Sequence, residues 1–319
     1  MTIKVWFSIL ASSLSYCYFI VSKIPKGIFR LFSLLPIIYI FTILPLCLSS
    51  PFLIGLSGLV FTWLANFKLL LFAFDHQNHT PPNSFLHFIF LTCLPIKIKQ
   101  NNKPSSENPK IPSKLALNYP TKVVFLAALV CSLDYRGNYL HQRILLVIYC
   151  LILYLLLDVV FGVFNYAARA LLGIELESPS DEPYFSTSLQ DFWGRRWNLM
   201  VTNVLRYTVY KPVRSCVGNA LGGRRWDPIA TVIGLMSAFL VSGLMHELIF
   251  YYITRATPTW EVTCFFVLHG ACLAVEIDLK RLLTGKFRLH WAVSGPLTVG
   301  FVVATAMWLF FSARSEARA

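Results

Sequence analysis

The chain has 319 residues, of which 56% are hydrophobic and 13% are charged, against about 25% charged residues in a typical soluble domain. This composition excludes a soluble globular enzyme and predicts an all-α, polytopic membrane protein. The formal net charge is +13, but the basic residues are spread between apolar segments instead of being gathered on one soluble face, which argues against nucleic-acid binding.

Eight apolar segments are candidate membrane-spanning helices, since a crossing needs roughly 17 to 25 mainly apolar residues. They lie at about 4–22, 31–49, 52–74, 121–134, 143–163, 229–253, 259–279 and 291–311, and the fourth is the shortest. Phe85–Ile96 is also apolar but shorter, and we expect a re-entrant or interfacial segment there. Because no long hydrophilic block separates these segments, we predict one membrane domain over 1–319, folded as a transmembrane helical bundle.

Polar residues near the spans have simple explanations. Lys68 lies in the third span close to its cytosolic end, where we expect its long side chain to reach the interface. The run Asp75–His79 is expected to be a polar loop end and not a metal cluster. The eight cysteines include no C-x-x-C pair, so the sequence indicates neither a disulfide framework nor a metal site.

The distribution of positive charge predicts which loops face the cytosol. With eight spans, the loops 23–30, 75–120, 164–228 and 280–290 together hold 20 of the 28 Lys and Arg residues. The opposite loops and both termini hold six, and the remaining two lie inside spans. We therefore expect both termini in the lumen or outside the cell and the long loop 164–228, which carries part of the candidate site, in the cytosol. Removing the fourth span would reverse the orientation of everything before it.

The loop 164–228 contains a predicted helix. Ser188 and Asp191 have the spacing of a capping box, so a helix should begin at Ser188. Leu189, Trp193, Trp197, Met200 and Val204 would then share its apolar face, while Asp191 and Arg195 would be placed to pair on another face. An alternative stays open, in which this helix simply lies at the interface with its tryptophans among the lipid headgroups.

His246 and Glu247 lie inside the apolar run Ile229–Ile253. Ionisable groups at membrane depth are costly and usually mark a functional site. If the run is helical, Ser242 and Gly243 lie one turn before His246, and their small side chains would leave room beside the imidazole. A structural alternative also stays open, in which His246 only forms a hydrogen bond between packed helices.

Two motifs together resemble a known family. SLQDFWGRRWN (188–198), followed by SGLMHELIFYY (242–252), resembles the membrane-bound O-acyltransferase superfamily and looks like its plant wax-ester synthase branch, the long-chain-alcohol O-fatty-acyltransferases. WLANFKLLLFAF (63–74), LPIKI (94–98) and PTWEVTCFFVLHG (258–270) extend the resemblance along nearly the whole chain.

The resemblance implies a helical bundle with a catalytic tunnel in the endoplasmic reticulum membrane, with acyl-CoA as co-substrate and no cofactor. It implies that His246 is the catalytic residue and that Asn198 belongs to the same site, whereas no catalytic role is carried onto His269. The candidate substrate-binding residues are the other members of the first motif, Asp191, Trp193, Arg195, Arg196 and Trp197. The arginines lie where the phosphates of CoA would arrive, but they equally satisfy the positive-inside rule.

Elementary chemistry agrees with these roles. Esterification needs a base for the hydroxyl and stabilisation of charge on the carbonyl oxygen. Burial disfavours the charged imidazolium, so His246 should be available as a base at neutral pH. Asn198 offers both a donor and an acceptor, and its partner could be His246, the hydroxyl or the thioester carbonyl. We expect no acyl-enzyme, since the alcohol can attack acyl-CoA directly.

Acyl-CoA would enter this site from the cytosol, and the lipid alcohol would enter it from the bilayer. The sequence makes no prediction of the oligomeric state. The acceptor could be a long-chain alcohol, a sterol or diacylglycerol, and the acyl group could be long or as short as acetyl. A transporter or a non-catalytic membrane scaffold remains a competing class, although no internal repeat of the kind many transporters show is visible.

Overall fold

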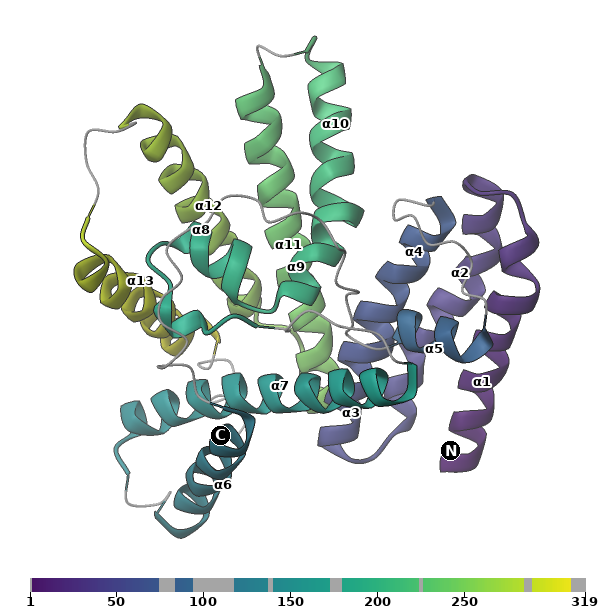
Figure 1. Cartoon of the computed structure of the whole chain (residues 1–319), viewed down its shortest axis with the longest axis horizontal. Helices are drawn as coiled ribbons and strands as arrows, with labels where there is room; N and C mark the ends of the chain where they lie inside the picture. Colours follow the sequence, from purple (N-terminus) through teal and green to yellow (C-terminus); the bar gives the residue numbers. More distant parts are fainter. Residues whose placement is uncertain are drawn as a thin grey trace. The chain divides into compact units, whose positions relative to one another are not determined.

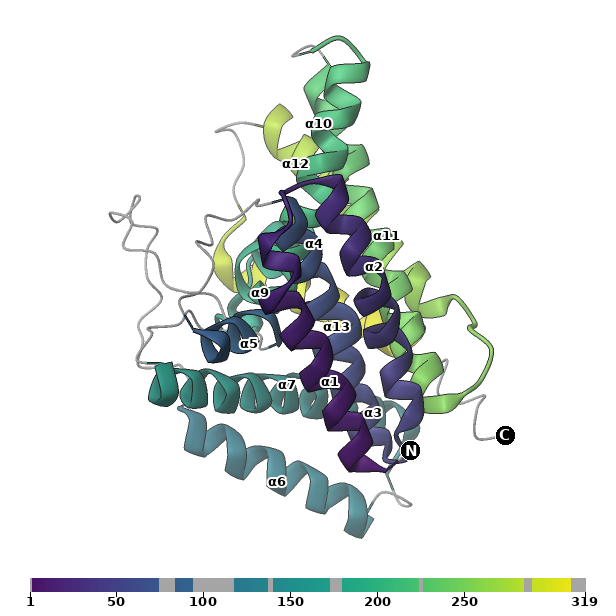
Figure 2. The same cartoon turned by 90° about the vertical axis from the view of Figure 1, so that its right-hand side faces the viewer.

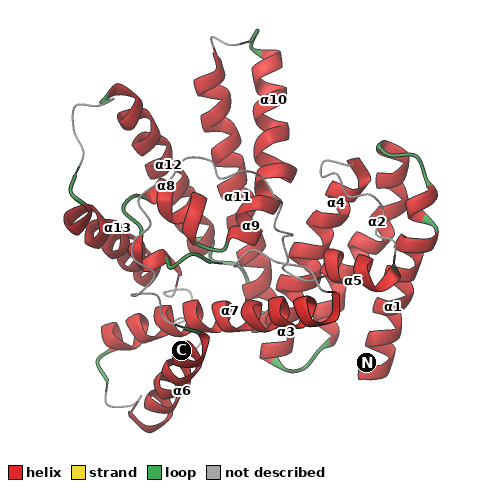
Figure 3. Ribbon diagram, viewed as in Figure 1, coloured by secondary structure: helices red, strands yellow, loops and turns green. Residues whose placement is uncertain are grey.

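The computed structural model describes residues 2–74, 84–93, 118–136, 140–172, 180–223, 226–283 and 289–310, without the side chains of 134–136 and 172. Every regular element in these ranges is a helix and none is a strand (Figure 3), which confirms the predicted all-α class. Asp75–His79 lies outside the described residues. The chain forms two compact units: unit 1 comprises Met1–Pro95, Met200–Lys286 and Ala313–Ala319, and unit 2 comprises Ile96–Leu199 and Phe287–Ser312. The prediction of a single domain over 1–319 stays a prediction.

Unit 1 contains most of the helices drawn in Figure 1. Its α-helices are α1 (Ile3–Phe19), α2 (Ile28–Ile43), α3 (Pro51–Ser57), α4 (Asn66–Phe74), α5 (Phe85–Cys93), α9 (Leu199–Leu205, whose first residue ends unit 2), α10 (Lys211–Ala220), α11 (Asp227–Thr254) and α12 (Glu261–Leu282). The 3-10 turns η1 (Val21–Lys23) and η2 (Leu44–Cys47) follow α1 and α2, and the π-helical stretches η3 (Gly58–Ala65) and η8 (Arg206–Tyr210) join α3 to α4 and α9 to α10. The helices α10 and α11 run side by side in Figures 1 and 2.

Unit 2 is built around two long helices. These are α6 (Tyr119–Arg136) and α7 (Gln142–Leu172), which pack on each other (Figure 2). The unit also holds the 3-10 turn η6 (Pro183–Phe185), α8 (Leu189–Asp191), the π-helical stretch η7 (Phe192–Arg196), α13 (Trp291–Thr305) and η10 (Ala306–Phe310). The first part of the predicted loop 164–228 is therefore helical, since α7 continues through the helix-favouring run Ala167–Ala170.

Seven helical segments in the described ranges are long and apolar enough to cross a membrane. They are Ile3–Lys23, Ile28–Cys47, Pro51–Phe74, Gln142–Leu171, Asp227–Thr254, Glu261–Leu282 and Trp291–Phe310. They match seven of the eight predicted spans. The remaining predicted span is the fourth, 121–134, which is helical as part of α6. Its apolar part Tyr119–Leu133 is shorter than the other spans, and its crossing stays a prediction. The nine residues of α5 agree with the short apolar segment expected from Phe85 onward.

Side-chain hydrogen bonds join α2 to the helices that carry the candidate site. Pro45 has no N–H to give to the carbonyl of Phe41, four residues earlier. Thr62 of η3 replaces it, because its hydroxyl donates to Phe41 O at 2.9 Å. Near this point the hydroxyl of Tyr252, on α11, donates to Thr42 O at 2.6 Å. The backbone groups of α2 therefore fix η3 and α11 together in the interior of unit 1.

Lys68 has a hydrogen-bond partner inside unit 1. Its Nζ donates to the carbonyl of Leu91 at 2.7 Å, in the last turn of α5, and its reach to the membrane interface stays a prediction. The last carbonyls of a helix have no partner within the helix, and a cation there also interacts favourably with the helix dipole. Arg30 acts similarly at the end of α4, where Nη1 donates to Phe72 O at 3.2 Å. Both cations stabilise helix C-termini inside unit 1.

Candidate active site

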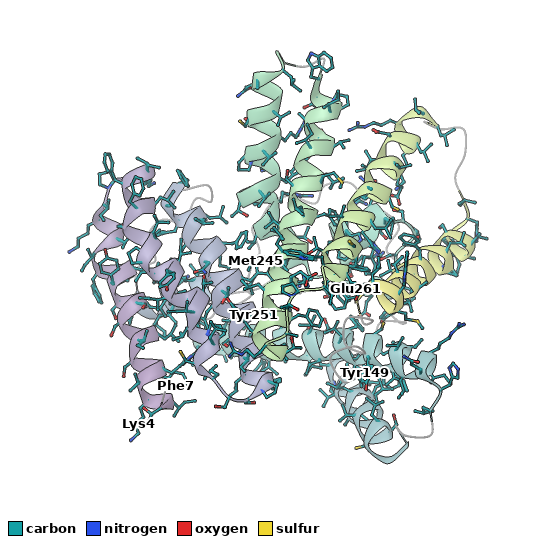
Figure 4. All side chains as sticks on the ribbon, turned by 180° about the vertical axis from the view of Figure 1, so that it is seen from behind. Lys4, Phe7, Tyr149, Met245, Tyr251 and Glu261 are labelled. Carbon is teal, nitrogen blue, oxygen red and sulfur yellow. The ribbon has the colours of Figure 1, made fainter. Side chains whose placement is uncertain are left out.

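The imidazole of His246 lies between two aromatic rings from different elements of unit 1. The ring of Phe266, on α12, stacks on it with centroids 4.4 Å apart and an interplanar angle of 26°. Trp63, on η3, meets it edge-on, with centroids 4.8 Å apart and an angle of 85°. Figure 4 labels Met245, the residue before His246, on α11, and Glu261 at the start of the neighbouring α12. Packing on two sides restricts the ring to one orientation.

A backbone hydrogen bond fixes the tautomer of His246. Its Nδ1 lies 2.7 Å from the carbonyl oxygen of Ser242, one helical turn earlier. A carbonyl oxygen only accepts hydrogen bonds, so Nδ1 must carry the proton, and in the neutral ring the lone pair then resides on Nε2. This is the arrangement that a general base requires, and the assignment of that role to His246 stays a prediction.

Gly243 allows close helix packing and does not leave the room beside the imidazole that the sequence had suggested. A Cβ built on Gly243 would lie 2.9 Å from the Cα of Thr263 and 3.4 Å from the Cβ of Phe266. The space beside the helix is therefore occupied by α12 and is not an opening next to the imidazole. Glycine at this position lets α11 and α12 approach closely, which brings Phe266 onto His246.

Glu247 also joins α11 to α12. It is buried, with 5% of its surface exposed, and its Oε1 accepts the backbone N–H of Thr263 at 3.1 Å. Thr263 is the third residue of α12, where the first N–H groups have no acceptor within the helix. A carboxyl group there also complements the positive end of the helix dipole. Glu247 thus caps α12, which explains an intramembrane acidic residue without a catalytic role.

His269 packs as a core residue. It is fully buried on α12, and its ring centroid lies 4.3 Å from that of Phe265. This placement agrees with a packing role for His269.

The predicted helix beginning at Ser188 is confirmed at its start and wrong in its length. The Ser188 hydroxyl accepts the N–H of Asp191 at 3.1 Å and so caps α8. After Asp191 the helix widens into η7 and stops, because Trp197 is extended and Asn198 adopts φ 39°, in the left-handed region that asparagine tolerates better than most residues. A new helix, α9, begins at Leu199, so the single apolar face expected from Leu189 to Val204 does not form.

The π-helical turn also changes the ion pair. Asp191 pairs with Arg196, with Nε 2.8 Å from Oδ2, whereas Arg195 is exposed. In a π-helix the residue five positions on lies above the first, and the backbone bond from Trp197 N to Phe192 O, at 2.8 Å, has this spacing. The expected pair of Asp191 with Arg195 assumed the α-helical spacing of four and is wrong.

The two tryptophans of the motif surround a residue that the sequence reasoning missed. Phe192 has 6% of its surface exposed; Trp197 stacks on it with centroids 5.5 Å apart, and Trp193 meets it edge-on at 5.0 Å. The hydrophobic pattern could have indicated Phe192, because it lies in the first turn after the cap. The aromatic packing holds the chain just before Asn198.

A buried ionic cluster in unit 2 was also missed. Lys122 of α6 lies 2.9 Å from Asp158 of α7 and 3.1 Å from Glu182, measured from Nζ to carboxylate oxygens. Arg196 in turn donates to the carbonyl oxygens of Asp181 and Glu182. The sequence feature that could have indicated this cluster is the presence of Lys122 and Asp158 within apolar segments. The cluster connects α6 and α7 to the segment that carries the first motif.

The candidate site residues fall in both units. Asp191, Arg196 and Trp197 lie close together in unit 2, where Asn198 follows them, and His246 lies in unit 1. The joining of Asn198 and His246 in one site stays a prediction. Within the described ranges no three His, Cys, Asp or Glu side chains are grouped so that they could hold a metal ion.

The fold and the half-buried imidazole define an integral, multi-pass membrane protein with a candidate base inside a span. Residues 177–268, which include both motifs, match the model of the Membrane bound O-acyl transferase family. The chain is 46% identical over 315 residues to the probable long-chain-alcohol O-fatty-acyltransferase 1 of Arabidopsis thaliana, covering 97% of this chain and 89% of the relative. Because the family model matches the segment with both motifs and a relative matches nearly the whole chain, the chain belongs to the membrane-bound O-acyltransferase family.

Further relatives agree with this assignment. The long-chain-alcohol O-fatty-acyltransferase of Simmondsia chinensis is 45% identical over 315 residues, or 96% of this chain and 87% of the relative. Acyl-CoA–sterol O-acyltransferase 1 of Arabidopsis thaliana is 40% identical over 320 residues, or 97% of this chain and 88% of the relative. The resemblance drawn from the two motifs is confirmed at the level of the family.

Proposed function

We propose that the protein is an acyl-CoA-dependent O-acyltransferase that esterifies a long-chain fatty alcohol and so forms a wax ester. The observation that carries the proposal is His246, which is oriented by Phe266 and Trp63 and holds its proton on Nδ1. It lies in the part of the chain that matches the family. The names of the relatives at 46% and 45% identity support a fatty alcohol as the acceptor.

In this mechanism Nε2 of His246 removes the hydroxyl proton as the alcohol oxygen attacks the carbonyl carbon of the thioester. The C–O bond forms, negative charge develops on the carbonyl oxygen, and the C–S bond then breaks. The CoA thiolate leaves and takes the proton from the imidazolium. The reaction needs no acyl-enzyme, cofactor or metal ion.

Asn198 belongs to the proposed site through the chain connection. It precedes Val201 by three residues, and consecutive Cα atoms are 3.8 Å apart, so its Cα lies within about 11 Å of that of Val201. Val201 packs in one buried cluster with Trp63, which contacts His246. Its amide would orient His246, the hydroxyl or the thioester carbonyl.

The two substrates would arrive from different phases. CoA is polyanionic and stays in water, where the exposed Arg195 is the candidate contact for its phosphates. Arg196 would act indirectly, because its guanidinium pairs with Asp191. A long-chain alcohol partitions into the bilayer, gaining about 0.8 kcal/mol per buried CH₂ group. We further propose that the enzyme lies in the endoplasmic reticulum membrane with its CoA entrance on the cytosolic side, and these two routes support a membrane that faces the cytosol.

The proposal is tested by incubating the purified protein with a matrix of acyl-CoAs and lipid alcohols and identifying products by mass spectrometry. Wax ester should be the main product, and it should require both the thioester and the fatty alcohol. Steryl ester as the main product would favour the activity named for the relative at 40% identity. A transporter or scaffold would form no ester from any combination.

A further inference from the structure

Trp63 carries a buried N–H group for which the described residues supply no acceptor. Its side chain has 2% of its surface exposed and is among the largest fully buried side chains of the described residues. Across the described ranges, its Nε1 has no hydrogen-bond partner. More than nine in ten buried polar groups in native proteins have a partner, so such a group needs a specific explanation.

A second tryptophan shows that unit 1 can satisfy a buried indole. Trp6, on α1, has 6% of its surface exposed, and its Nε1 donates to the carbonyl of Leu44 at 3.2 Å. Thr62, next to Trp63, likewise gives its hydroxyl proton to Phe41 O. The buried indole of Trp6 and the hydroxyl next to Trp63 in the sequence are therefore both paired, and the Trp63 N–H differs from them.

The position of Trp63 indicates what its N–H could serve. Its ring contacts the imidazole of His246, edge to face, with the centroids 4.8 Å apart. It lies on η3, a π-helical stretch inside a span, and such stretches often occur at functional sites because they shift side chains out of the α-helical register. The apolar cluster of Leu64, Val204 and Met245 around it excludes water. A donor in this environment is strong when an acceptor arrives.

We propose that the Nε1–H of Trp63 donates a hydrogen bond to the carbonyl oxygen of the acyl thioester and stabilises the charge that forms there. This inference rests on the proposed function. An indole N–H only donates, so its partner must be an acceptor. The thioester carbonyl is an acceptor that must approach His246, because the carbon that it belongs to is attacked by the alcohol deprotonated there.

The reaction balances with Trp63 in this role. His246 takes the alcohol proton, the new C–O bond converts the carbonyl into a tetrahedral oxyanion, and the indole N–H holds that oxyanion without transferring its proton. The C–S bond then breaks, the carbonyl re-forms, and the thiolate receives the proton from His246. Since the bond strengthens as charge develops, the indole acts mainly on kcat.

The test compares Trp63→Phe with Trp6→Phe in the purified full-length protein. Trp63→Phe removes the N–H and retains an aromatic ring, and kcat should fall about 10²- to 10³-fold, the usual effect of removing one such donor. Trp6→Phe loses a hydrogen bond within the fold, so it should lower the Tm more than Trp63→Phe and leave kcat near the wild-type value. Wild-type turnover by Trp63→Phe would overturn the proposal.

Two further measurements keep the test independent of folding. Replacing residue 63 with the benzothienyl isostere of tryptophan retains the fused ring and removes only the N–H, and kcat should fall as in Trp63→Phe. The wild type should also bind a ketone analogue of acyl-CoA more tightly than the matching thioether without a carbonyl, and Trp63→Phe should lose this discrimination. Full turnover by the isostere, or unchanged discrimination by Trp63→Phe, would overturn the inference. Absence of ester from the wild type would instead overturn the proposed function.

Discussion

At the scale of single residues, ionisable groups inside the spans divide into two kinds. Glu247 and Lys68 each satisfy a backbone group at a helix end, whereas His246 is held by two rings and a backbone carbonyl in the tautomer that a base needs. The sequence identified all three as unusual, because each interrupts an apolar run. It could not separate them, since the acceptor or donor that each one meets lies on another helix or one turn away.

The capping role of Glu247 gives the first prediction. Glu247→Leu removes the acceptor for the Thr263 N–H and should lower stability by about 1–3 kcal/mol, the cost of leaving a buried donor without a partner. Glu247→Gln retains a carbonyl oxygen at this position and should lose much less. Thermal unfolding in detergent measures both variants. Equal stability of the two would show that the N–H of α12 does not depend on this side chain.

At the scale of elements, helix boundaries were predicted well where hydropathy sets them and poorly where hydrogen-bond register does. The apolar runs predicted the seven long helices, because a continuous apolar segment of this length favours a crossing, although α7 continues to Leu172, beyond the predicted end at 163. The segment after Ser188 was predicted as one α-helix, but it widens into η7 and ends at Asn198. A change from four-residue to five-residue spacing leaves no trace in hydrophobic periodicity, so the pairing of Asp191 with Arg196 required the structure.

The close contact of α11 with α12 gives a prediction at this scale. Gly243→Ala would place a Cβ 2.9 Å from the Cα of Thr263, so α12 must move, and Phe266 with it. Such overpacking typically costs about 1–3 kcal/mol, and activity should fall because the ring on His246 is displaced. Gly300→Ala is the matched control, since a Cβ on Gly300, in the helix α13, meets no atom of the described residues within 4 Å. That variant should be as stable as the wild type or slightly more stable.

The melting temperature and the turnover of the two variants are compared. Gly243→Ala should have a lower melting temperature and a lower turnover than the wild type, and Gly300→Ala should have neither. If the two alanines behave alike, the α11–α12 contact does not position Phe266 in the way described.

At the scale of the whole molecule, charge counting predicted an orientation that depends on the segment 121–134. With 20 Lys and Arg on one set of loops and six on the other, the long loop 164–228 is expected in the cytosol and both termini in the lumen. This holds only if the fourth segment crosses. The buried pair of Lys122 with Asp158 neutralises a charge that would oppose insertion of that segment.

Two native cysteines test this orientation directly. Cys216 and Cys47 are both exposed, and charge counting places the first on the cytosolic side and the second on the luminal side. Each is retained alone, with the other seven cysteines replaced by alanine, and sealed microsomes are treated with an impermeant maleimide. Cys216 should be labelled at once and Cys47 only after the vesicles are opened. Labelling of both in sealed vesicles would show that 121–134 does not cross.

The account rests most on His246 and Asn198 acting in one transition state, and a double-mutant cycle on turnover tests it. His246→Ala should lower ester formation about 10²- to 10⁴-fold, the usual contribution of a general base, in protein that still folds and inserts. If Asn198 serves the same step, the double variant should be scarcely slower than His246→Ala alone. Near-normal turnover by His246→Ala, or losses that multiply fully in the double variant, would contradict this account.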